Sequence, residues 1–169
     1  MKRLNAKCLG AMLLVSWLVP LPALAAEDVL PARLMTLGLA RDIAQGAVDA
    51  CREMGYQVSV VVVDRSGRTM VLLRDVFANQ YTNELARGKA NAVVLGSVST
   101  AELKANRGDI AAELNLLDGI IILEGGLPIQ VAGSMIGAVG VSGAPGGDKD
   151  AACAQKGLDA VQERLEFVD

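Results

Sequence analysis

A lysine on the apolar side of a predicted helix is the first residue of this chain that could bind a ligand. The helix is predicted over residues 82–95, where Lys89 lies one turn after Leu85 and one turn before Val93. The ammonium group of such a lysine can hold the carboxylate of a ligand. It can also reach water while its aliphatic stem covers apolar surface. The spacing leaves both interpretations open.

Two further side chains lie close to this helix in the sequence. Tyr81 precedes its first residue, and it is one of only two tyrosines in the chain. A phenol at this position can face a ligand, or it can pack locally against the start of the helix. Arg74 ends a predicted strand and could complete a cationic clamp for a carboxylate, although a surface ion pair with Asp75 explains it equally well.

A glycine-rich stretch over residues 124–150 is predicted to form two strands, a turn and the start of a last helix. It holds eight of the 18 glycines: Gly125, Gly126, Gly133, Gly137, Gly140, Gly143, Gly146 and Gly147. Glycine inside a strand is tolerated where a second backbone or a ligand comes close. After the turn, Asp148 is expected to be the N-cap of the helix. The turn could bind an anion through Gly143, Gly146, Gly147 and Asp148, or it could be a tight connection without a ligand.

The absence of histidine excludes several kinds of site. The chain has none, so a Ser-His-Asp triad and a zinc site with a histidine ligand are both impossible. A haem iron bound by this chain would need a tyrosine, methionine or cysteine ligand, or a weaker oxygen or amine donor.

Cys51 and Cys153 could pair in an oxidising compartment, but their small apolar neighbours favour unpaired thiols in the core.

The first residues have the pattern of a secretory signal peptide. Three basic residues precede an apolar run over residues 9–24, which ends in Ala23-Leu24-Ala25. We therefore predict a signal peptide at residues 1–25, a single domain at residues 26–169, and a periplasmic or secreted protein. Cleavage would leave 13 basic and 19 acidic residues, a net charge of −6. A domain with this negative charge and so few aromatic residues is not expected to bind nucleic acid, because it lacks both a basic surface for phosphates and aromatic side chains for stacking on bases.

The periodicity of the remaining chain predicts an α/β (α+β) domain. The expected element order is α-β-β-α-α-β-β-β-α, with helices packed on a five-stranded, mainly antiparallel sheet. The four helices of this order are predicted at residues 37–54, 82–95, 101–105 and about 149–167, and the five strands at residues 57–64, 69–74, 120–123, 127–131 and 135–141. Residues 109–115 are a candidate for one further short helix. The glycine turn and Tyr81 would lie at connections between these elements.

Several motifs in this order resemble the GlcG/HbpS-like haem-binding family, which is related to the C-terminal domain of PduO-type proteins. They are VVVDRSGR at residues 61–68, ELARGKANA at 84–92, GGLPI at 125–129 and IGAVGVSGAPGGDKDAACAQKGLDA at 136–160. The resemblance covers nearly all of the predicted domain. It implies a sheet with helices on its faces, a homo-oligomer and, in several members, bound haem. Family members often carry histidine in the segment equivalent to residues 78–82, and Tyr81 takes that place here.

The resemblance leads to an exported haem-binding protein as the main hypothesis, serving in haem handling or redox sensing more than in turnover. Tyr81 would bind the iron, and Lys89 or Arg74 would pair with the propionates, close to Gly125 and Gly126. A second hypothesis is a periplasmic binder or enzyme for a small organic acid, held by the glycine-rich turn. A third is a ligand-free assembly partner of a membrane sensor or of an exported enzyme.

Overall fold

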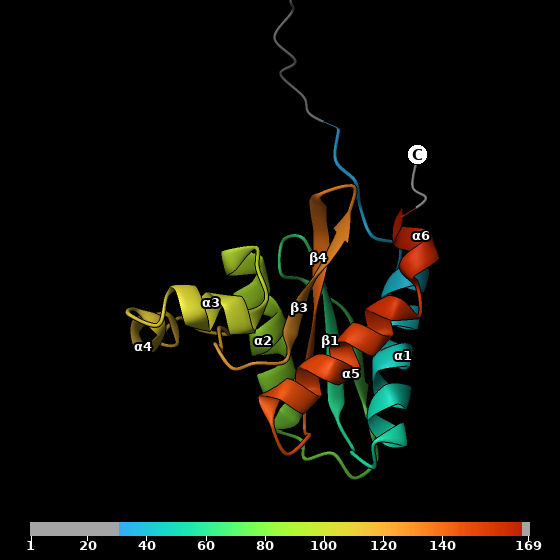
Figure 1. The fold of residues 1–169 in the computed structure, drawn as a ribbon, viewed down its shortest axis with the longest axis horizontal. Coiled ribbons are helices and arrows are strands. Elements are labelled where there is room, and N and C mark those ends of the chain that lie inside the picture. The colour runs from blue at the N-terminus through green and yellow to red at the C-terminus, as the bar shows by residue number, and fades with distance from the viewer. Residues whose placement is uncertain (1–30, 167–169) are drawn as a thin grey trace, which may run out of the picture. The chain divides into compact units, whose positions relative to one another are not determined.

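A run of four valines, Val60 to Val63, forms the centre of a four-stranded antiparallel sheet (Figure 1). The computed structural model describes residues 31–166 of the chain. The strands are β1 (Ser59–Asp64), β2 (Thr69–Arg74), β3 (Gly126–Val131) and β4 (Ser134–Ser142), in the order β2-β1-β4-β3. The helices are α1 (Leu37–Glu53), α2 (Thr82–Gly96), α3 (Thr100–Asn106), α4 (Ala111–Leu114), α5 (Gly147–Asp159) and α6 (Gln162–Glu166). The predicted α/β domain with helices on an antiparallel sheet is confirmed.

Helices cover both faces of the sheet. α1 and α5 pack against the face that carries Val60 and Val62, and α2 packs against the face that carries Val61 and Val63 (Figure 1). Because both faces are covered, β1 is a continuous apolar run, with none of the alternation of a strand that is exposed on one side. β2 and β3 are the edge strands. Pro128, which has no N–H group to donate to a neighbouring strand, lies in β3.

The sheet has four strands, so the predicted fifth strand is wrong. Residues 120–123, which were expected to form it, have an irregular backbone. The N–H of Ile121 donates to the carbonyl oxygen of Gly88 in α2 (3.1 Å), and the N–H of Ile122 donates to Oδ1 of Asn115 (2.7 Å). These donors already have partners in a helix and a side chain, so they are not available to pair with a strand.

The predicted last helix is divided into α5 and α6. α5 begins at Gly147 with Gly146 as its N-cap, so the predicted cap at Asp148 is wrong. The carbonyl oxygen of Gly146 accepts the N–H of Asp150 (3.1 Å), which places Asp148 inside the first turn of the helix. Between the two helices the chain turns at Val161, whose buried side chain joins the core.

The predicted signal peptide, residues 1–25, lies outside the described residues. The compact domain begins at Ala32, a few residues after the predicted cleavage site. Within residues 31–166, none of the helices is both long enough and apolar enough to cross a membrane.

A glycine in β4 sets how closely α2 packs on the sheet. A Cβ atom built on Gly140 would lie 2.0 Å from the carbonyl oxygen of Ala86 and 2.8 Å from the backbone nitrogen of Ala90. Only a residue without a side chain allows the backbones of α2 and β4 to approach so closely. Gly140 therefore serves helix packing.

Cys51 and Cys153 form a disulfide, so the prediction of two unpaired core thiols is wrong. The bond joins α1 to α5 across a separation of 102 residues, with a Cα–Cα distance of 5.3 Å. The two helices come this close because small residues line their crossing. A Cβ atom on Gly157 would lie 2.5 Å from the carbonyl oxygen of Ile43. Removal of a native disulfide from a small domain typically costs about 2–5 kcal/mol.

The packing at Gly140 predicts the effect of adding one methyl group. Gly140→Ala should lower the free energy of unfolding by about 3 kcal/mol or more, because neither backbone in contact can move away freely. Urea unfolding followed by circular dichroism measures the change. Gly38→Ala is the matched control, since a Cβ atom at Gly38 meets nothing within 4 Å and helix α1 favours alanine. Equal stability of the two variants would contradict the packing argument.

Candidate functional site

The loop between β2 and α2, residues 75–81, is supported by hydrogen bonds from Arg74 at the end of β2 and from its own residue Asn79. We call it the β2–α2 loop. Nη1 of Arg74 donates to the carbonyl oxygens of Ala78 (2.7 Å) and Asp75 (3.3 Å). The N–H of Tyr81 donates to Oδ1 of Asn79 (2.9 Å). Arg74 therefore lies beside the β2–α2 loop and supports it from one end, while Asn79 supports the start of α2.

A second arginine anchors the same loop to α1. Arg52 donates through Nε to Oδ2 of Asp75 (2.7 Å) and through Nη2 to Oδ1 (2.9 Å). These two hydrogen bonds hold the pKa of the Asp75 carboxyl below its usual value, although burial acts in the opposite direction. The N–H of Asp75 also donates to the carbonyl oxygen of Val58 (2.9 Å). The ion pair expected for Asp75 is thus made with Arg52, and Arg74 remains beside the loop carbonyls.

Three large apolar or aromatic side chains project from this anchored loop into solvent. The exposed fractions are 71% for Val76, 84% for Phe77 and 68% for Tyr81. Within residues 31–166, the Tyr81 hydroxyl has no hydrogen-bond partner. The phenol therefore does not hold the start of α2 in place through a hydrogen bond. Val76 and Phe77 were not predicted from the sequence as site residues. The available signal was a pair of apolar residues in a short loop between a strand end and a helix start.

Lys89 is buried and pairs with a carboxylate of its own chain. Its exposed fraction is 3%, and Nζ donates to Oδ2 of Asp150 (2.7 Å) and to the carbonyl oxygen of Val141 (2.9 Å). Its stem does not extend the ammonium to water, and its charge is not directed at an open site. Burial raises the pKa of the Asp150 carboxyl, while the hydrogen bonds from Lys89 and from the N–H of Ala144 lower it.

The glycines predicted to bind a ligand make room for this ion pair and its surroundings. A Cβ atom on Gly125 would lie 2.7 Å from Cβ of Asp150, and one on Gly126 would lie 2.7 Å from the carbonyl oxygen of Lys89. The same holds for the predicted anion-binding turn. A Cβ atom added to Gly143 would contact the carbonyl oxygen of Gln57, one added to Gly146 would contact the carboxylate of Asp148, and one added to Gly147 would contact Glu124.

The carboxylate that enters the glycine-rich turn belongs to Asp150. Its Oδ1 accepts the N–H of Ala144 at 3.0 Å. Asp150 was not predicted from the sequence as a functional residue. The available signal was an acidic side chain in the first turn of a predicted helix. In the structure this carboxylate pairs with Lys89, which lies 61 positions earlier in the chain.

A small network of hydroxyl and amide groups joins β1 to the start of α2, near the β2–α2 loop. Oγ of Ser59 lies 2.7 Å from Oγ1 of Thr82 and donates to Oδ1 of Asn83 (2.8 Å). Ser59 is buried and faces Arg74 of β2 across the sheet. This network fixes the start of α2, and therefore Tyr81, relative to the end of the sheet.

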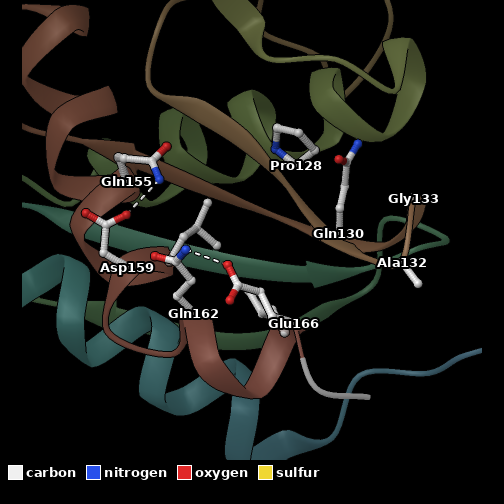
Figure 2. Close-up of a pocket in the computed structure, with 10 residues that line it drawn as sticks. Pro128, Gln130, Ala132, Gly133, Gln155, Asp159, Gln162 and Glu166 are labelled. Carbon is white, nitrogen blue, oxygen red and sulfur yellow. Dashed lines mark hydrogen bonds between the residues drawn. The ribbon is translucent and has the colours of Figure 1, made fainter. Parts of the chain in front are cut away.

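A groove with a volume of about 370 Å³ lies between β3 and the corner of α5 and α6 (Figure 2). Four of its polar side chains form two pairs: Gln155 donates to Asp159 (2.9 Å) and Gln162 donates to Glu166 (2.6 Å). None of the predicted ligand-binding residues lines it. Within the described part of the chain, no group of three or more acidic or cysteine side chains could hold a metal ion.

A family model described as "Haem degrading protein HbpS-like" matches residues 35–159. The chain belongs to the HbpS-like family. The crystal structure of HbpS is 36% identical, with a TM-score of 0.74, and the match covers 82% of this chain and 98% of HbpS. Protein ORFY of Klebsiella pneumoniae is 27% identical, with a TM-score of 0.75, over 82% of this chain and 97% of ORFY. The structure of a complex of PduOC with haem is 25% identical, with a TM-score of 0.67, over 76% of this chain and 95% of PduOC.

Removing one partner of the buried pair should destabilise this HbpS-like domain strongly. Lys89→Met leaves Asp150 buried without its cation, and we expect a loss of about 3–5 kcal/mol in the free energy of unfolding. The double variant Lys89→Met/Asp150→Leu should recover most of that loss, because it leaves no buried charge. Urea unfolding of the two variants and the wild type measures both effects.

The control for this prediction is Lys149→Met, which removes a partly exposed lysine 3.4 Å from Asp148. It should change the stability by less than about 1 kcal/mol, as surface ion pairs do. A Lys89→Met variant as stable as Lys149→Met would show that the buried pair does not support the fold.

Proposed function

We propose that this protein binds haem at the β2–α2 loop, with Tyr81 as the ligand of the iron. The observation that carries the proposal is a phenol that is largely exposed, has no hydrogen-bond partner within residues 31–166 and projects from an anchored loop. Membership of the HbpS-like family and the likeness to the PduOC complex with haem support it. Tyrosine is an established proximal ligand of haem iron, and this chain has no histidine to compete with it.

The residues around Tyr81 fit the other parts of a haem molecule. Val76 and Phe77 offer apolar and aromatic surface to the porphyrin. Arg74 lies beside the loop, and its guanidinium can donate to a propionate through nitrogens that do not contact Ala78 or Asp75. Lys89 cannot fill this role, since its ammonium is buried against Asp150. Haem, when bound, would supply the redox chemistry, and the chain would hold and orient it.

The proposed role is haem handling or redox sensing outside the cytoplasm. The pattern of residues 1–25 favours export. The disulfide between Cys51 and Cys153 also favours an oxidising compartment, because such bonds are rare in the cytosol of most organisms. Lys89 and Asp150 are buried and paired with each other, so neither is assigned a role in turnover.

Titration with haemin tests the ligand assignment. The protein with its signal sequence removed should show a saturable shift of the Soret band. Tyr81→Phe should weaken binding at least tenfold and change the spectrum, because the phenolate is lost while the ring remains. Tyr56→Phe is the matched control, since Tyr56 is the other tyrosine and packs against the core. If both variants bind haemin as the wild type does, Tyr81 is not the ligand.

Export can be tested with the full chain expressed in a bacterium. We expect the protein in the periplasmic fraction, with a mature N-terminus at Ala26 or Glu27. N-terminal sequencing and intact mass measurement identify the cleavage site. A full-length chain recovered from the cytoplasm would contradict the export proposal and leave the haem proposal intact.

A further inference from the structure

A second cleft lies at the end of the sheet opposite to the β2–α2 loop. It has a volume of about 260 Å³ and is lined by residues from the segment before α1, from α1 itself, from the β3–β4 hairpin and from α6 (Figure 1). The β2–α2 loop follows Arg74, at one end of the sheet. Val131 and Ile136, which line the cleft, lie beside the turn that joins β3 to β4, at the other end. We call it the α1–β4 cleft.

The inner wall of the α1–β4 cleft is apolar. Leu39 of α1, Val131 of β3 and Ile136 of β4 line it, and none of the three is more than 9% exposed. Leu34 also lines the cleft but is 74% exposed, so it lies at the opening. The segment before α1 is held in place by Met35, whose buried side chain joins the core. The cleft therefore offers an alkyl group an apolar surface that is open to solvent on one side.

The charged side chains of the cleft are cationic. Arg33 and Arg164 line it, both are exposed, and none of the described lining residues is acidic. Nη1 of Arg164 donates to Oδ2 of Asp42 (2.7 Å), and Oδ1 of the same carboxylate accepts hydrogen bonds from Arg41. One carboxylate thus serves two guanidiniums, and no ion pair joins Arg33 to an acidic side chain within residues 31–166. The cleft keeps a net positive charge in an acidic chain, which favours an anion.

We propose that the α1–β4 cleft binds a small amphipathic carboxylate of the medium-chain fatty acid type. The alkyl chain would lie against Leu39, Val131 and Ile136, where water is excluded from it. The carboxylate would accept hydrogen bonds from Arg33 and from the N–H groups of Arg164 that do not contact Asp42. Pockets for drug-sized ligands have volumes of about 300–1,000 Å³, so this cleft suits a single alkyl chain and is too small for a porphyrin. The site is therefore separate from the proposed haem site.

Isothermal titration calorimetry with octanoate tests the proposal on the protein without residues 1–25. Binding should saturate at one octanoate per chain. From butanoate to hexanoate to octanoate, the affinity should rise about two- to fourfold for each added methylene, because each one buries more apolar surface. Octylamine has a chain of the same length and the opposite charge, and it should bind about tenfold more weakly or less. Absence of saturable octanoate binding, or equal affinity for octylamine, would overturn the proposal.

Variants of the two arginines test which groups hold the carboxylate. Arg33→Gln should weaken octanoate binding about tenfold, and Arg33→Gln/Arg164→Gln should remove the preference over octylamine. Arg107→Gln is the matched control, since it removes a 52% exposed arginine whose partner is Asp109 and which does not line the cleft. Circular dichroism shows whether each variant is folded. Octanoate affinity that is the same in the double variant as in Arg107→Gln would contradict the assigned role of the arginines.

A photoreactive octanoate with a diazirine near the end of its chain locates the site directly. After irradiation, peptide mass spectrometry should find the label on the residues of the inner wall, Leu39, Val131 or Ile136. Excess octanoate should prevent this labelling. Labelling confined to the β2–α2 loop or to other surfaces would overturn the assignment to the α1–β4 cleft.

Discussion

The buried ion pair between Lys89 and Asp150 is the interaction on which the arrangement of this domain depends. Two charges removed from water are tolerated only when their hydrogen bonds are satisfied. Here Lys89 also donates to the carbonyl oxygen of Val141, and Asp150 also accepts the N–H of Ala144. The pair therefore fixes α2, the end of β4 and the start of α5 relative to one another. Because α2 begins at the β2–α2 loop, the same constraint helps to position the candidate site.

Several glycines of the domain leave the space that this ion pair and the closely packed helices need. Gly125 leaves room for the ion pair, and Gly140 allows the backbone of α2 to approach β4. Gly157 does the same between α1 and α5, where the disulfide of Cys51 and Cys153 joins the two helices. The glycine-rich character that suggested a ligand site from the sequence thus serves internal packing at these positions. Exposed apolar and aromatic side chains are found instead on the β2–α2 loop.

The site could be predicted only in part, and the residues show why. Lys89 was identified because a lysine on an apolar helix face is unusual, and the expected partner of its ammonium was either the carboxylate of a ligand or water. Its partner is Asp150, which lies 61 positions away, and no local pattern links the two. Tyr81 was identified as a rare aromatic residue at a helix start, and the structure adds that it is exposed on an anchored loop. Phe77 was missed because a short loop has no periodicity that distinguishes an exposed aromatic side chain from a buried one.

The α/β class and the approximate bounds of most elements could be predicted from the sequence, because the spacing of apolar residues, the caps and the glycine stops act over a few positions. The sequence also carried the motifs that identify the HbpS-like family. Three features became evident only in the folded domain: Cys51 pairs with Cys153, residues 120–123 form no strand, and Asp150 neutralises the cation of Lys89. Each of these outcomes depends on contacts between segments far apart in the chain. A local pattern cannot specify such contacts, since they arise from how closely the helices and the sheet pack.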